Sequence, residues 1–205
     1  MAVRETEPVA AAPTVADPAP LGLAGFAMTT MLSQAVNAGW MGHNGSDIWL
    51  GMAIFYGGLA QFMAGMWEFR RNNTFGATAF SSYGAFWMGF AILFFFTPVT
   101  KLALGVPNAN VPVSWFLLGW TIFTAYMTIA ALRTNGAVLV VFILLTLTFL
   151  FLWLGAMNNA AAGHGLTAVG GYLGVITALA AWYTSLAGVA NSTWGRVVFP
   201  VFPLT

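Results

Sequence analysis

The sequence predicts an all-α integral membrane protein, a bundle of six transmembrane helices with both termini in the cytoplasm. The first observation is a set of six apolar stretches, residues 21–41, 48–67, 77–96, 113–132, 137–157 and 167–190. Each reaches the roughly 20 residues that a helix needs to cross the hydrocarbon core. The second is composition, because 60% of the residues are hydrophobic and 5% are charged, against roughly 25% charged in soluble domains. The third is that the charges lie between the stretches or at their ends.

Basic residues predict the orientation. An even number of spans places both termini on one side, and five arginines share that side: Arg4, Arg70, Arg71, Arg133 and Arg196. The other side has only Lys101, so the arginine side is expected to be cytoplasmic. Residues 1–16 have no apolar run, which argues against a signal peptide and predicts a disordered cytoplasmic tail. Residues 17–196 form the expected membrane transport domain, with a longer connection at 97–112, and 197–205 a short C-terminal tail.

Several classes of function are disfavoured by composition. The net charge of +1 gives no basic field for nucleic acid. Cysteine is absent, and the two histidines, His43 and His164, lie in or beside predicted loops, so the chain offers neither a metal cluster nor a nucleophile–base pair at membrane depth. A phosphate-binding glycine loop is also missing. We therefore expect no enzymatic activity and no cofactor.

The first stretch carries a polar face. Asp17 and Pro18 suit a helix start, and two rows of residues then recur at four-residue spacing. One row is Gly22, Phe26, Thr30 and Gln34, and the other is Gly25, Thr29, Ser33 and Asn37. Lipid does not solvate hydroxyl and amide groups, so this face meets other helices or water. Helix packing explains the small residues, whereas the run of polar side chains favours a path for a solute.

The second stretch places two polar groups at helical spacing. Gln61 is an amide near mid-membrane, and Glu68 lies at the cytoplasmic end beside Arg70 and Arg71. Glu68 is either half of an interfacial ion pair, which contributes little stability, or a carboxylate that accepts a proton at the mouth of a path.

The third stretch has two faces, and the last three have fewer polar signals. Thr78, Ser81 and Ser82 share one face of the third, whereas Phe80, Tyr83, Trp87 and their neighbours lie roughly opposite. A helix of this kind contacts protein on both sides. The fourth stretch contains Thr124 and the fifth Thr146 and Thr148, while Gly170, Gly174 and Ala178 form a small-residue ridge on the sixth, typical of helix packing.

Several motifs resemble the acetate uptake transporter family, which includes the succinate–acetate permeases. Residues 17–23, Asp-Pro-Ala-Pro-Leu-Gly-Leu, resemble its Asn-Pro-Ala-Pro-Leu-Gly-Leu signature. Residues 54–61, Ile-Phe-Tyr-Gly-Gly-Leu-Ala-Gln, and 73–76, Asn-Thr-Phe-Gly, follow in the same order as in the family. The element 82–84, Ser-Tyr-Gly, completes the match. Asp17 stands where the signature has Asn, which puts in doubt a direct substrate role for this position.

The resemblance implies a transporter of acetate and related small carboxylates, in some members succinate. It implies six helices per protomer, a path through each protomer, and a homohexamer in the lipid bilayer of the cell membrane. It also implies a hydrophobic constriction, which by position falls on Phe26, Tyr83 and, in the weakly matching fifth stretch, Leu147.

Two mechanisms and two other functions stay open. Stripping an unpaired anion of water costs several kcal/mol, and protonating a simple carboxylic acid at pH 7 costs about 3–4 kcal/mol. Anion channel and proton-coupled symport are therefore both compatible with the sequence, with Glu68 as the candidate for proton coupling. The alternatives are a channel or exporter for another small solute such as ammonia, and a non-transporting structural membrane protein. The expected path residues are Thr29, Thr30, Ser33, Asn37, Gln61 and Thr124.

Overall fold

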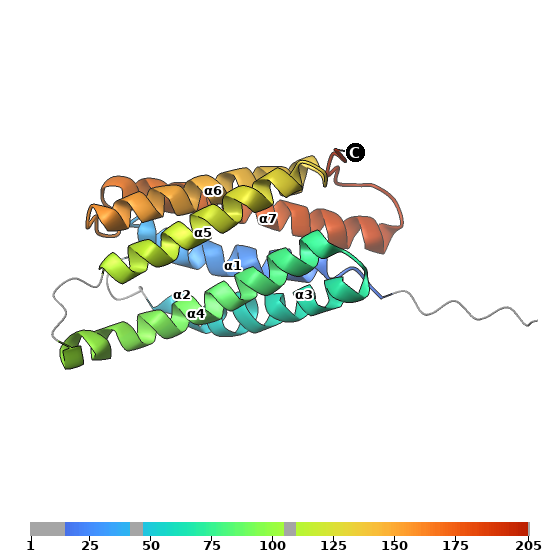
Figure 1. The fold of residues 1–205 in the computed structure, drawn as a ribbon. Helices are drawn as coiled ribbons and strands as arrows, with labels where there is room; N and C mark the ends of the chain where they lie inside the picture. The colour runs from blue at the N-terminus through green and yellow to red at the C-terminus, as the bar shows by residue number, and fades with distance from the viewer. Residues whose placement is uncertain (1–14, 42–46, 105–109, 205) are drawn as a thin grey trace, which may run out of the picture.

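Six helical rods form a bundle in the computed structural model, which describes residues 15–41, 47–104 and 110–204. The first rod is α1 (Ala19–Asn37), and the second joins α2 (Ile48–Ile54), the π-helical η2 (Phe55–Ala60) and α3 (Gln61–Arg70) end to end. The others are α4 (Thr74–Leu104), α5 (Asn110–Ala131), α6 (Gly136–Met157) and α7 (Gly165–Trp194). In Figure 1, α1 lies between α5, α6 and α7 on one side and α2, α3 and α4 on the other.

The six rods correspond to the six predicted stretches. In the described part of the chain, five are long and apolar enough to cross a membrane: Ile48–Arg70, Thr74–Phe95, Pro112–Ala131, Gly136–Met157 and Gly165–Trp194. The remaining rod, α1, is less apolar because its 19 residues include several hydroxyl and amide side chains. Most of the predicted N-terminal tail, and His43, lie outside the described residues.

The connection expected at 97–112 is largely helical. α4 continues to Leu104 and α5 begins at Asn110, so both helices extend into this connection. Lys-Leu-Ala-Leu at 101–104 consists of strong helix formers, which favour extension of the helix beyond the apolar stretch.

Small residues let α1 and α7 approach their neighbours closely. A Cβ atom at Gly57 in η2 would lie 2.7 Å from the Cβ of Thr29 in α1, and one at Gly170 in α7 would lie 2.8 Å from the Leu152 side chain in α6. The small-residue ridge of the sixth stretch therefore packs within the protomer. Close backbone approach between small residues is a general way to join membrane helices.

The chain folds back after α7. Gly195, with φ 63°, ends that helix in a left-handed conformation, and residues 195–204, here called the C-terminal strap, return to the start of α6. The backbone N–H groups of Gly136 and Ala137 donate to Phe202 O (2.7 Å) and Val201 O (3.1 Å). These bonds satisfy two of the first N–H groups of α6, which have no partner inside the helix. The first described residues and the C-terminus lie at the same end of the bundle (Figure 1).

Candidate transport path

Two cavities lie inside the bundle. The proximal cavity, about 460 Å³, is bordered by Asp17 just before α1, by Arg71 just after α3 and by Asn135 just before α6. The distal cavity, about 490 Å³, is bordered by Asn37 at the end of α1 and by residues 159–162 after α6. Because the start and the end of α1 lie at opposite ends of the bundle, the cavities lie toward opposite ends.

Three helices line both cavities with a single face each. Residues three or four apart lie on the same side of a helix, so each set below is a continuous strip. The strip on α1 is Ala19, Leu23, Phe26, Thr30, Gln34 and Asn37. The strip on α6 includes Val138, Val141, Leu145, Thr148 and Leu152, and that on α4 includes Ala79, Tyr83, Phe86 and Phe90.

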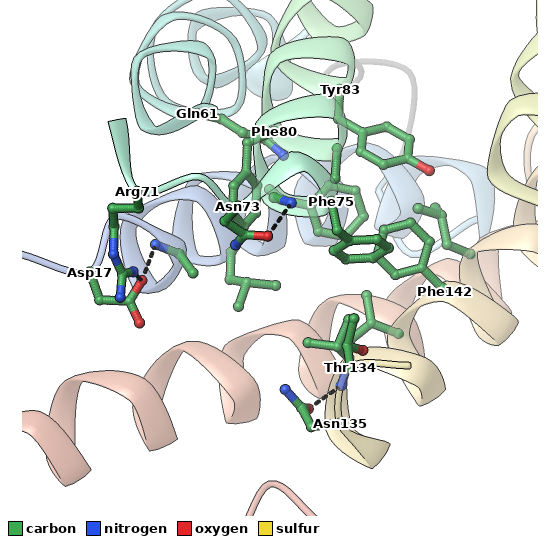
Figure 2. A pocket seen from close by; sticks show the side chains of 18 residues that line it. Asp17, Gln61, Arg71, Asn73, Phe75, Phe80, Tyr83, Thr134, Asn135 and Phe142 are labelled. Atoms are coloured by element: carbon green, nitrogen blue, oxygen red, sulfur yellow. Dashed lines mark hydrogen bonds and ion pairs between the residues drawn. The ribbon is translucent and has the colours of Figure 1, made fainter. Parts of the chain in front are cut away.

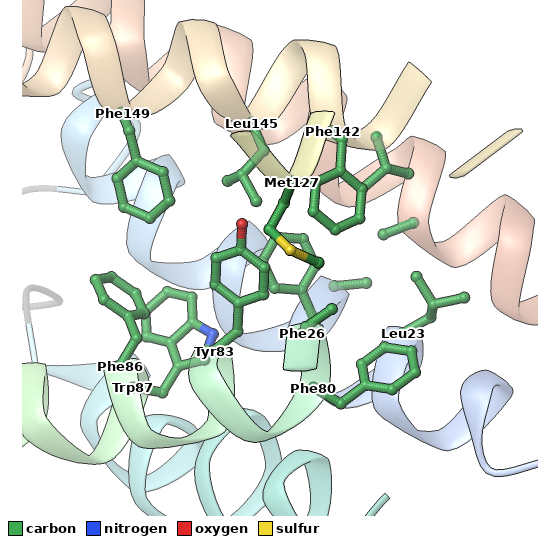
Figure 3. Close-up of a cluster of buried hydrophobic side chains, with 14 of the residues drawn as sticks. Leu23, Phe26, Phe80, Tyr83, Phe86, Trp87, Met127, Phe142, Leu145 and Phe149 are labelled. Atoms are coloured by element: carbon green, nitrogen blue, oxygen red, sulfur yellow. The ribbon is translucent and has the colours of Figure 1, made fainter. Parts of the chain in front are cut away.

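The cavities meet at Phe26 and Leu145, which line both of them. Phe26 is 4% and Leu145 is 3% exposed. Tyr83 lines the proximal cavity and packs beside Phe26, with ring centroids 5.9 Å apart. Figure 3 shows Phe26, Tyr83 and Leu145 in one buried cluster, contributed by α1, α4 and α6. The cavities are therefore separated by a narrow apolar barrier at mid-bundle.

Leu145, and not Leu147, occupies the position expected for the leucine of the constriction. Leu147 is 37% exposed and lines neither cavity. Two residues are about 200° apart around an α-helix, so a side chain two positions from an inward-facing one points outward. The placement of Leu147 in the path is corrected accordingly.

The two polar rows of α1 have different surroundings. Thr30, Gln34 and Asn37 line the distal cavity, whereas Thr29 and Ser33 line neither cavity. The Thr29 hydroxyl is fully buried and lies within hydrogen-bond distance of Gly25 O (2.9 Å) and Met52 O (3.3 Å). Ser33 donates to Thr30 O at 3.2 Å. Thr30 and Gln34 of one row therefore face the distal cavity, whereas Gly25 and Thr29 of the other row pack against the second rod.

Thr124 acts through Tyr83. It is fully buried on α5 and lines neither cavity, but its hydroxyl oxygen lies 2.8 Å from that of Tyr83. The buried Tyr83 hydroxyl thus has a partner, and the ring has a defined orientation beside Phe26.

The proximal cavity has polar groups at its mouth and one deeper amide. Arg71 donates to Asp17 Oδ1, which also accepts the Ala19 backbone N–H at 3.1 Å. Gln61 lines the cavity while 1% exposed, and its Oε1 has no hydrogen-bond partner in the described structure. Figure 2 shows Asp17 and Arg71 on one side of the cavity and Asn135 across from them.

Glu68 lies behind the wall of the proximal cavity. Its side chain is fully buried, and Oε2 accepts a hydrogen bond of 2.9 Å from Asn73 Nδ2. Asn73 itself lines the cavity. The other oxygen, Oε1, has no partner within the described residues. Among the described residues, Glu68 forms no ion pair with Arg70 or Arg71, and Arg71 pairs with Asp17 instead.

Several residues that line the cavities were not predicted from the sequence. Arg71 was considered only for orientation and as a neighbour of Glu68, and Leu145 and Thr148 were not chosen. Hydrophobic periodicity did not indicate Leu145, because α6 is apolar on all sides.

Two relatives have the names of transport proteins. Acetate permease A of Emericella nidulans (strain FGSC A4) is 42% identical over 197 residues, covering 91% of this chain and 65% of its own. This chain therefore spans less than two thirds of the length of that relative. The succinate-acetate/proton symporter SatP of Escherichia coli (strain K12) is 40% identical over 188 residues, covering 91% of this chain and 95% of its own.

A solved structure has the same fold. The structure of the bacterial acetate channel SatP matches with a TM-score of 0.82 and 37% sequence identity, covering 92% of this chain and 99% of that one. The family model described as GPR1/FUN34/yaaH family matches residues 4–205. With its six rods, its motifs in order and these matches, the chain belongs to the GPR1/FUN34/yaaH family.

Proposed function

We propose that this protein carries acetate and related small carboxylates, including succinate, across the cell membrane through a path inside each protomer. The observation that carries the proposal is the pair of cavities toward opposite ends of the bundle, separated only by the barrier at Phe26 and Leu145. The relatives named as an acetate permease and a succinate-acetate symporter support the choice of substrate.

The lining suits a small carboxylate. Hydroxyl and amide groups of Thr30, Gln34, Asn37 and Thr148 line the distal cavity, and none of the described residues that line it is charged. Such groups donate hydrogen bonds to a carboxylate without holding it as strongly as a cation would. The barrier itself is apolar, so passage requires either brief loss of water around an anion or protonation.

Glu68 is the group that we propose for proton coupling. Its carboxyl group is buried, one oxygen is free of hydrogen bonds in the described structure, and Asn73 links the other oxygen to the cavity wall. A proton held there would lie beside the path of the substrate. If the protein is an anion channel, this carboxyl group is instead structural.

We also propose that both termini are cytoplasmic and that six copies assemble into a ring. Five arginines on the side of the termini support the orientation. The hexamer follows from the family resemblance. Exposed small residues, Gly51 on α2 and Ala85 and Gly89 on α4, leave room on the outer surface for close approach of another copy.

Uptake of labelled acetate into liposomes containing the purified protein, at zero membrane potential, tests the proposal. Protein-dependent uptake should exceed that of protein-free liposomes and be inhibited by formate or propionate but not by ammonium. Accumulation above equilibrium only with an inward proton gradient would mean symport, and equilibration whatever the gradient would mean a channel. Inhibition by ammonium alone would favour the ammonia alternative, and absence of any flux would favour a structural role.

A further inference from the structure

In the part of the chain that the structure describes, a single ion pair supplies all the charge that lines the two cavities. Among the described residues that line the two cavities, Arg71 is the only cation and Asp17 the only carboxylate, and the two form an ion pair. Their side chains are 36% and 45% exposed, so water and solutes reach them. A carboxylate entering from this end therefore meets a guanidinium that already holds a carboxylate.

The occupant of this guanidinium is a chemical analogue of acetate. The Asp17 side chain ends in a CH₂–COO⁻ group, which differs from acetate only by its link to the backbone. Asp17 Oδ1 accepts from Arg71 Nη1 and from the backbone N–H of Ala19. The ion pair therefore shows how a carboxylate sits on Arg71 at the mouth of the proximal cavity (Figure 2).

We propose that Arg71 is the carboxylate-binding residue at the proximal mouth, and that Asp17 competes with the substrate for it. This inference rests on the proposed function. A substrate carboxylate displaces Asp17, and Asp17 returns when the substrate moves on. Exposed ion pairs are weak and screened by salt, so this exchange is easy. Competition keeps binding weak, which suits a path because a substrate must leave as readily as it enters.

The test is the half-saturation concentration for acetate flux in four variants. Asp17→Asn keeps a residue that can cap α1 but removes the competitor, so half-saturation should fall about 3-fold, the scale of an exposed ion pair. Arg71→Gln should raise it by a similar factor. The double variant Asp17→Asn/Arg71→Gln should have the same half-saturation concentration as Arg71→Gln alone, because the competitor matters only when Arg71 is present. Arg70→Gln is the matched control, because Arg70 is exposed and lines neither cavity.

Salt provides a second readout that a structural role would not change. The difference between wild type and Asp17→Asn should shrink as ionic strength rises. Arg71→Lys keeps the charge without the planar fork and should lie between wild type and Arg71→Gln; it also serves if Arg71→Gln does not fold. An Asp17→Asn effect of equal size with and without Arg71, or no effect, would overturn the inference. Failure of the wild type to move any carboxylate would instead reject the proposed function.

Discussion

The hydroxyl oxygens of Tyr83 and Thr124 lie 2.8 Å apart, and this hydrogen bond orients the Tyr83 ring beside Phe26 at the barrier. Tyr83 comes from α4 and Thr124 from α5. Both residues are buried. Thr124 lies outside both cavities, and its hydroxyl contacts Tyr83, which lies at the barrier.

Replacing Thr124 with Val should therefore loosen the barrier. Val keeps the shape but leaves the buried Tyr83 hydroxyl without a partner, which costs about 1–3 kcal/mol and favours a ring orientation nearer the water of the cavity. We expect a several-fold rise in propionate flux relative to acetate. Thr121→Val is the control, because the Thr121 hydroxyl donates to Leu117 O in its own helix (2.8 Å). An equal change in both variants would contradict the argument.

Shortening the barrier side chains should admit larger acids. Leu145→Ala and Phe26→Ala remove buried atoms where the two cavities meet, so flux of propionate and larger monocarboxylates should rise relative to acetate. Leu147→Ala, on the outer face of the same helix as Leu145, should leave selectivity unchanged. Competition among labelled acids in proteoliposomes measures this directly. A selectivity change in Leu147→Ala alone would return the constriction to that position.

The contact between Gly57 and Thr29 should make Gly57 intolerant of a side chain. A Cβ there would lie 2.7 Å from the Thr29 Cβ, and overpacking of this kind typically costs about 1–3 kcal/mol. Gly57→Ala should lower the thermal unfolding temperature in detergent. Gly119→Ala is the matched control, because nothing lies within 4 Å of a Cβ there. Equal stability of the two variants would mean that η2 moves aside at little cost.

The C-terminal strap should depend on Asn191. Its Nδ2 donates to Phe199 O (2.8 Å), and its Oδ1 accepts the N–H groups of Val198 (2.7 Å) and Phe199 (3.0 Å). Asn191→Ala should release the strap and expose it to carboxypeptidase. Asn158→Ala, which removes one exposed bond to Leu154 O, should not. Equal digestion of both variants would show that the backbone bonds to α6 are sufficient to hold the strap.

Hydropathy and charge predicted the six rods, because the cost of charge and unpaired backbone in lipid constrains every span in the same way. Which polar residues of α1 pack against a neighbouring helix and which face a cavity was not predictable in the same way. Thr29 and Thr30 are adjacent and chemically identical, and only the position of η2 decides that Thr29 packs against a neighbour while Thr30 faces a cavity.

Contacts between residues that lie far apart in the chain could not be predicted from the sequence either. The ion pair of Asp17 and Arg71 joins residues 54 positions apart, and Asn191 has no local pattern that indicates a folded strap. Leu145 and Leu147 illustrate the limit within one helix. α6 is apolar on all sides, so hydrophobic periodicity does not identify its inward face.

Glu68→Gln gives the sharpest test of proton coupling. Gln keeps an oxygen that can accept the hydrogen bond from Asn73 Nδ2, which is 2.9 Å from Glu68 Oε2 in the wild type, but it cannot exchange a proton. If Glu68 couples a proton to transport, the variant should equilibrate labelled acetate yet lose accumulation driven by an inward proton gradient. Asn73→Ala, which leaves the carboxyl group but removes its link to the cavity wall, should weaken the coupling without abolishing it. Accumulation by Glu68→Gln at the wild-type level would make the buried carboxyl group structural, and the proton would then have to cross the barrier at Phe26 and Leu145 on the substrate itself.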